Sequence, residues 1–168
     1  MPAEWRELYG IHNGMNNAGN FGSLFVGMNF LTLDAVMREH ANNNVAVEPL
    51  TDMAAVVEPG IKWGRMHNPK WIALAHDFGE TLLRVDMDPD SNGQIGQVIF
   101  TDHAFDTCIL LAPSIGRFLC DFADDLEHGR YFLDPEALKD GKQFLACLTK
   151  NDIINWQRSP RWRHLKHK

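Results

Sequence analysis

The sequence predicts a single α+β domain, in which a mostly antiparallel, twisted sheet is packed by helices and followed by a helical extension. Four short apolar segments between residues 71 and 111 are separated by turn residues, a pattern typical of an antiparallel meander. Helical patterns lie on both sides of this meander. The 168 residues, 45% of them apolar and 23% charged, are enough for one domain with a buried core. We therefore assign residues 1–130 to the domain and residues 131–168 to a C-terminal helical extension with a basic tail.

The strands of the predicted meander cover residues 71–75, 81–87, 97–101 and 107–111. The connection between the second and third strands, residues 88–96, is rich in Asp, Asn and Gly, which are typical of turns. This acidic loop is longer than a two-residue hairpin allows. Trp71 opens the first strand, so we expect its ring in the core. Trp63 lies in a glycine-rich stretch and is expected to be partly exposed.

Three helices are predicted around the meander. The first covers residues 2–9, begins with Pro2 and ends before an Asn-Gly pair. The second covers residues 33–41, is capped by Thr32, and has an apolar face made of Leu33, Val36, Met37 and His40. The third covers residues 113–126, and its apolar stripe comprises Ile115, Phe118, Leu119, Phe122, Ala123 and Leu126.

The remaining segments are assigned from turn residues and short apolar runs. In chain order we expect a loop at 16–23, a strand at 24–30, a segment wrapping the sheet edge at 45–69, helices at 135–138, 144–148 and 153–156, and a basic tail from residue 159.

Charge is distributed unevenly along the chain. Residues 1–156 contain 22 Asp and Glu against 11 Lys and Arg, whereas the last 12 residues contain five basic residues and no acidic one. An acidic body disfavours a nucleic-acid partner and is compatible with a basic protein partner, although solubility alone is the commoner reason for such a charge. The N-terminus lacks the apolar core of a signal peptide and no apolar run is long enough to span a membrane, so we expect a cytoplasmic protein without a membrane partner.

The three cysteines, Cys108, Cys120 and Cys147, lie in apolar segments and show no CxxC spacing. We expect all three to be reduced core residues.

Several of these pieces, taken in order, resemble the SUKH superfamily. They are the strand opened by Trp71, the Asp-Phe-Gly turn at 77–79, Asp-Met-Asp-Pro at 86–89, Gly-Gln-Val-Ile at 96–99 and Ser-Ile-Gly-Arg-Phe-Leu at 114–119. The helix that begins at Pro2 also fits, and the resemblance covers roughly residues 2–126. This superfamily contains bacterial immunity proteins and fungal regulators of cell-wall glucan synthesis.

The acidic loop is the best candidate for a metal site. It matches the first half of a calcium-binding EF-hand loop at Asp88, Asp90, Asn92, Gly93 and Ile95. The second half fails, because Ile99 occupies the position of the bidentate Glu and a strand follows in place of a helix. We expect a structural hairpin loop with no tight metal site, and we expect no cofactor.

No catalytic constellation is predicted. The eight histidines show no metal-ligand spacing, and His76 and His103, which neighbour Asp77 and Asp102, lie beside residues that alternate to the other strand face. Asp77 and Asp102 could approach each other at one end of the sheet, which we interpret as surface charge. Ser114 lies in Pro-Ser-Ile-Gly, a sequence typical of the first turn of a helix. It does not match the G-x-S-x-G motif that surrounds a hydrolase nucleophile.

The resemblance implies protein binding without catalysis. From the resemblance we expect an immunity protein that neutralises a secreted polymorphic or contact-dependent toxin, with a nuclease as the expected toxin. An acidic body is consistent with this, because it steers a basic partner toward it. The expected contacts lie on an exposed sheet face and its loops, at Asp86, Asp88, Asp90, Asp102 and Asp106. Two alternatives stay open: a non-catalytic regulator or scaffold of the glucan-synthesis type, and a metal-dependent enzyme that uses the acidic loop. The oligomeric state is unknown.

Overall fold

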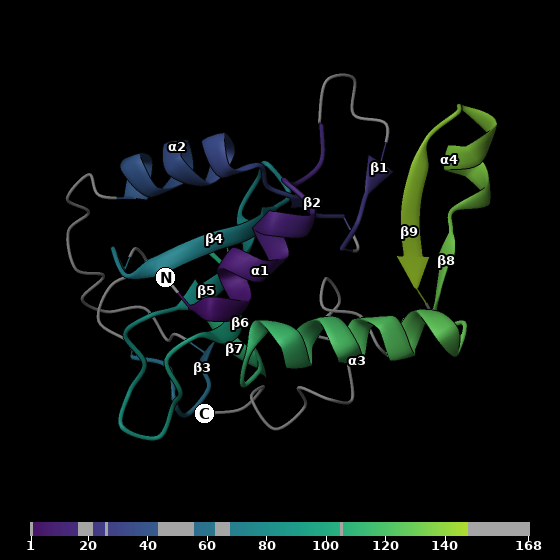
Figure 1. Ribbon diagram of the computed structural model, residues 1–168. Helices are drawn as coiled ribbons and strands as arrows, with labels where there is room; N and C mark the ends of the chain where they lie inside the picture. Colours follow the sequence, from purple (N-terminus) through teal and green to yellow (C-terminus); the bar gives the residue numbers. More distant parts are fainter. Residues whose placement is uncertain are drawn as a thin grey trace.

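Four consecutive strands form an antiparallel meander in the middle of a six-stranded sheet, as the sequence pattern predicted (Figure 1). They are β4 (Trp71–His76), β5 (Thr81–Asp86), β6 (Gln97–Asp102) and β7 (Thr107–Ala112). Each pairs antiparallel with the next, and the β5–β6 register runs without a shift from Thr81↔Asp102 to Asp86↔Gln97. The computed structural model describes residues 2–16, 22–25, 27–43, 56–62, 68–104 and 106–147.

Two short strands border the meander and make the sheet mixed. At one edge β2 (Asn29–Phe30) pairs antiparallel with β4, and at the other β3 (Val56–Val57) pairs parallel with β7. The strand predicted at 24–30 is shorter than expected because the chain turns back between Phe25 and Met28, which bridge each other. The segment predicted to wrap the sheet edge does so at β3. Trp63 and the rest of 63–67 lie outside the described residues.

The three predicted helices are present as α1 (Ala3–Ile11), α2 (Leu33–Asn43) and α3 (Ile115–Glu127). Thr32 caps α2, since its Oγ1 accepts a hydrogen bond from the backbone N of Ala35 at 3.2 Å. The expected apolar face of α2 is wrong in part. Val36 is buried, but Leu33 is 40% and Met37 70% exposed.

The extension holds strands where helices were expected. Its described part consists of β8 (Tyr131–Leu133), the short helix α4 (Pro135–Lys139) and β9 (Gln143–Cys147). The helix α4 confirms the prediction at 135–138. The helix predicted at 144–148 is wrong over its described residues 144–147, because β9 pairs there antiparallel with β8 and parallel with β1 (Gly22–Ser23). The loop predicted at 16–23 therefore contains this strand. The helix predicted at 153–156 and the basic tail lie outside the described residues.

Both faces of the six-stranded sheet are buried, so the prediction of one exposed face is wrong. All six residues of β6 are buried. Because strand residues alternate between faces, Val98 and Phe100 join the main core with α1 and α3, and Ile99 joins Trp71 and Cys108 in a second cluster.

An aromatic chain runs through the main core on its helix side. Neighbouring rings along it have centroids between 4.6 and 6.3 Å apart, within the range in which aromatic side chains attract each other. The chain consists of Trp5, Tyr9, Phe30, Phe25, Phe122 and Tyr131. It links α1, the turn before β2, α3 and β8.

The three cysteines are free thiols, as expected, but Cys120 is exposed and is not a core residue. Among the described residues, no helix combines the length and hydropathy needed to cross a membrane.

Candidate functional site: the acidic loop

The acidic loop is anchored to the chain segment that follows β3. The backbone oxygen of Gly60 accepts a hydrogen bond from the backbone N of Asp90 in the loop at 3.1 Å, and another from Nε2 of Gln97, the residue that follows the loop, at 2.9 Å. A Cβ on Gly93 would lie 2.1 Å from the oxygen of Gly60, so only glycine fits there. The loop is therefore shaped by packing against residues about 30 positions earlier in the chain.

Asp86 lies at the base of this loop and is fully buried. Its carboxylate accepts hydrogen bonds from Nε2 of Gln97 at 2.9 Å and from the backbone N of Asp88 at 2.8 Å. Burial raises the pKa of Asp86, and these hydrogen bonds oppose the shift without cancelling it. Asp86 thus closes the loop from inside and offers no carboxylate to a partner.

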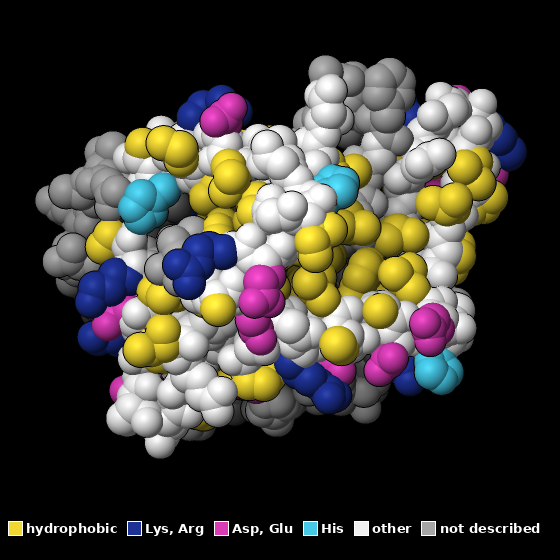
Figure 2. Space-filling view, in the orientation of Figure 1, with side chains coloured by type: hydrophobic (Ala, Val, Ile, Leu, Met, Phe, Trp, Pro, Cys, Tyr) yellow, Lys and Arg dark blue, Asp and Glu magenta, His cyan; other side chains and the backbone are white. Residues whose placement is uncertain are grey.

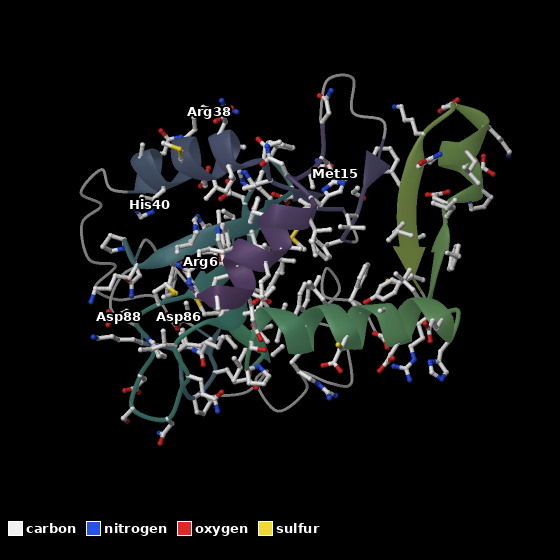
Figure 3. The ribbon with its side chains drawn as sticks, viewed as in Figure 1. Arg6, Met15, Arg38, His40, Asp86 and Asp88 are labelled. Carbon is white, nitrogen blue, oxygen red and sulfur yellow. The ribbon has the colours of Figure 1, made fainter. Side chains whose placement is uncertain are left out.

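Asp88 is held at the surface between two lysines. Nζ of Lys62 lies 3.3 Å from its carboxylate and Nζ of Lys70 lies 3.5 Å from it. The hydrogen bond from Lys62, together with the positive charge of both lysines, lowers the pKa of Asp88. Figure 3 shows Asp86 and Asp88 at the same end of the sheet. The lysines offset the negative charge that the sequence suggested for this loop.

Three of the five aspartates proposed as partner contacts are buried. Asp86, Asp102 and Asp106 are 0%, 6% and 6% exposed. The Oδ1 atom of Asp102 accepts a hydrogen bond from the backbone N of Ala104 at 3.0 Å, so this residue shapes its own turn. Only Asp88 and Asp90 are placed to meet a partner, and their role in binding stays a prediction.

Within the described residues, no group of three or more His, Cys, Asp or Glu side chains is placed to hold a metal ion. The loop that resembles half of an EF-hand does not converge on a cation position, because Asp88 faces Lys62 and Lys70, and Ile99 is buried in β6.

The other candidate residues serve the local fold. Asp77 accepts hydrogen bonds from the backbone N of Gly79 at 2.8 Å and of Thr81 at 3.1 Å, which fixes the β4–β5 turn. Ser114 is the N-cap of α3 and accepts from the backbone N of Arg117 at 3.2 Å. His67, His164 and His167 lie outside the described residues.

Sequence reasoning missed Arg84, which is fully buried in β5. Its guanidinium carbon lies 5.7 Å from the ring centre of Trp71, and its Nη2 lies 3.2 Å from Nε2 of His103. Burial lowers the pKa of Arg84 to about 10. The one signal for it in the sequence is a single basic residue between the apolar residues Leu82, Leu83 and Val85.

Comparison with known proteins identifies one family and several similar fungal proteins. The model of the SMI1 / KNR4 family (SUKH-1) matches residues 1–121. The glucan synthesis regulatory protein of Neurospora crassa is 32% identical over 120 residues, which cover 69% of this chain and 22% of that protein. The cell wall biosynthesis/cell cycle regulator smi1 of Schizosaccharomyces pombe is 28% identical over 149 residues, 81% of this chain and 30% of that protein.

The cell wall assembly regulator SMI1 of Saccharomyces cerevisiae is 39% identical over 66 residues, which cover 39% of this chain and 13% of that protein. This chain thus spans less than a third of the length of these relatives.

Proposed function

The chain belongs to the SMI1/KNR4 (SUKH-1) family, and from this premise we propose that it is a non-catalytic domain that regulates cell-wall glucan synthesis by binding another protein. One observation carries the proposal. The relatives from N. crassa, S. pombe and S. cerevisiae are named as regulators of glucan synthesis, of wall biosynthesis and of wall assembly. These names favour the regulator alternative over toxin immunity, which stays a prediction.

A binding role is supported by how the polar side chains are used. Three acidic side chains near the acidic loop and the β4–β5 turn, which a catalytic site could have used, instead bond to neighbouring parts of the fold. Asp77 fixes a turn, Asp86 holds Gln97, and Asp88 pairs with Lys62 and Lys70. Side chains engaged in this way stabilise the domain, and their donors and acceptors are not directed toward a common reacting centre.

A domain exchange in S. pombe tests the proposal. The segment of smi1 that matches this chain is replaced by this chain in the chromosomal gene, and incorporation of labelled glucose into wall glucan is measured. We expect incorporation close to that of the parent strain. A strain that lacks the segment is the first control, and a strain carrying an unrelated α+β domain of the same length is the second.

Glucan incorporation equal to that of the segment-deletion strain, with the exchanged protein present at normal abundance, would remove the regulator proposal. Immunity to a toxin would then be the better account of the family membership.

A further inference from the structure

An apolar surface lies between α1, α3 and the hairpin of β8 and β9. Figure 1 shows a space between α1 and β9 above α3, and Figure 2 shows that hydrophobic side chains line this space and remain uncovered in that view. We call it the helical surface, defined by Leu8, Ile11, Leu119, Ala123, Leu126 and Leu145.

One side of the helical surface is formed by α1. The carboxylate of Glu4 reaches α3, where it accepts hydrogen bonds from the backbone N of Gly116 at 3.1 Å and from Oγ of Ser114 at 3.2 Å. Residues four and seven positions apart lie on the same helix face, so Leu8 and Ile11 are on the α1 face that Glu4 turns toward α3. Ile11 is 87% exposed.

The floor of the helical surface is formed by α3. Gly116 contacts Glu4, and Leu119 and Ala123 continue the same face at intervals of three and four residues. Ala123 is exposed and Leu126 is 38% exposed. The buried residues of α3, Ile115, Phe118 and Phe122, lie beside this face. The apolar surface of α3 is therefore wider than the part that is buried in the core.

The far side is formed by β9. The ring of Tyr131 in β8 lies 5.2 Å from that of Phe122 in α3, so this face of the hairpin is turned toward α3. Tyr131 pairs with Cys147, and Leu145 shares the face of Cys147 because alternate strand residues point to the same side. Leu145 packs against the main core but remains partly exposed.

Carboxylates without ion pairs border the helical surface. In the part of the chain that the structure describes, exposed Glu7 of α1 and exposed Glu127 of α3 form no ion pair, whereas Asp121 and Asp125 pair with arginines. By helical geometry, Glu127 lies beside Ala123, and Glu7 lies beside Ile11. Together α1 and α3 contain six acidic and two basic residues. The border is therefore negative and available to a partner.

We propose that the helical surface binds an amphipathic helix of a partner protein that carries Leu or Ile on one face and Lys or Arg along its edges. This inference rests on the proposed protein-binding function and names the chemistry of its partner. An apolar floor with an acidic border matches such a helix, because the aliphatic side chains bury area while the basic side chains meet Glu7 and Glu127. The net excess of 11 acidic residues over residues 1–156 attracts the same partner from a distance.

Binding of a synthetic peptide to the full chain tests this surface. The probe is a fluorescein-labelled peptide of about 18 residues with Leu at helical i, i+3, i+4, i+7 spacing and Lys elsewhere, followed by fluorescence anisotropy. We expect Ile11→Asp and Leu126→Asp to weaken binding at least about ten-fold, because each places a charge on the apolar helical surface. We expect Glu127→Lys to slow association and to reduce the dependence of the affinity on salt.

Matched controls come from exposed residues elsewhere in the chain. Met37→Asp in α2 and Ile95→Asp in the acidic loop also place a charge on an exposed apolar residue, since Met37 is 70% and Ile95 72% exposed, and they should leave the affinity unchanged. Asp90→Lys reverses a charge on the acidic loop and is the control for Glu127→Lys. Circular dichroism of each variant shows that it is folded.

Three results would overturn the proposal. One is equal binding of a peptide in which Glu replaces every Lys. Another is weakening by Asp90→Lys with no effect of Glu127→Lys, which would place the contacts on the acidic loop. The third is sedimentation of the unmodified chain as a dimer that Ile11→Asp dissociates, which would make a second copy the occupant. If the domain exchange fails but the peptide binds and is weakened by the variants of the helical surface, only the assignment to glucan synthesis is contradicted. The proposal that the helical surface binds an amphipathic helix then stands.

Discussion

Trp71 combines complete burial with a cationic neighbour, because its ring is 0% exposed and the guanidinium of Arg84 lies over it. We expect Trp71→Ala to lower the free energy of unfolding by roughly 3 to 5 kcal/mol, since it leaves a large cavity and removes the ring that covers Arg84. Urea unfolding followed by circular dichroism measures this change. Phe78→Ala is the control, because Phe78 is 60% exposed, and its effect should stay within about 0.5 kcal/mol. A Trp71→Ala variant that unfolds at the parent's urea concentration would contradict the burial of the ring.

Asp86 makes stability depend on pH in a direction opposite to that of most aspartates. Its pKa is raised by burial, so the folded chain binds a proton more readily than the unfolded chain between the ordinary Asp pKa and the raised value. The Asp86 contribution to stability therefore increases as pH falls through this window and is lost as pH rises above it. We expect the unfolding free energy of the parent, minus that of Asp86→Asn, to increase when the pH is lowered from about 7 to about 4.

Asp88→Asn is the matched control for this pH series. The pKa of Asp88 is lowered by Lys62 and Lys70, so its contribution is present above the ordinary Asp pKa and is lost as pH falls through the lowered value. The difference between the parent and Asp88→Asn should therefore stay constant between about pH 7 and about pH 4 and decrease only when the series is continued below about pH 4. Two difference curves with the same slope would show that the burial of Asp86 does not control its titration.

Among the secondary-structure elements, α1 is attached to α3 through one carboxylate. Glu4 bonds to Ser114 and to the backbone N of Gly116 at the start of α3, where the helix dipole favours a negative charge. We expect Glu4→Ala to cost about 1 to 2 kcal/mol of unfolding free energy, and Glu4→Gln to cost less, because an amide oxygen still accepts one of the two bonds. Thermal and urea unfolding measure both changes.

Glu7→Ala removes a carboxylate from the same helix at an exposed position without an ion pair. It should change stability by no more than about 0.5 kcal/mol. Equal costs for the Glu4 and Glu7 variants would mean that general charge, and not the contact with α3, explains the effect.

Helices and strands that are specified by the residue pattern within their own segment could be predicted from the sequence. The meander follows from four apolar runs separated by turns, and α3 follows from its apolar stripe and from Ser114 as its cap. β9 was mistaken for a helix because a five-residue apolar run has no decisive period. Its strand conformation comes from pairing with β8 and with β1, and β1 lies far away in the sequence.

At the scale of the whole molecule, the acidic composition was a poor guide to where carboxylates are exposed. The sequence placed five aspartates on an exposed sheet face and its loops, but Asp86, Asp102 and Asp106 are buried. Residue 60 returns to the acidic loop beside Asp86, and β3 pairs next to Asp106. These contacts join residues separated by tens of positions, and periodicity within one segment carries no information about them. The helical surface also depends on such contacts, because only folding brings α1, α3 and β9 together.

The parallel pairing of β1 with β9 has a consequence for the order in which the chain acquires its structure. Gly22 pairs with Gln143, about 120 residues later, whereas the strands of the meander pair with their immediate successors. Closing so long a loop costs more chain entropy than closing the meander turns, and two paired residues return little in exchange. During synthesis, β9 leaves the ribosome after every other described strand, so the six-stranded sheet can assemble before the three-stranded one exists. The side of the helical surface formed by β9 is then the last part of that surface to be completed.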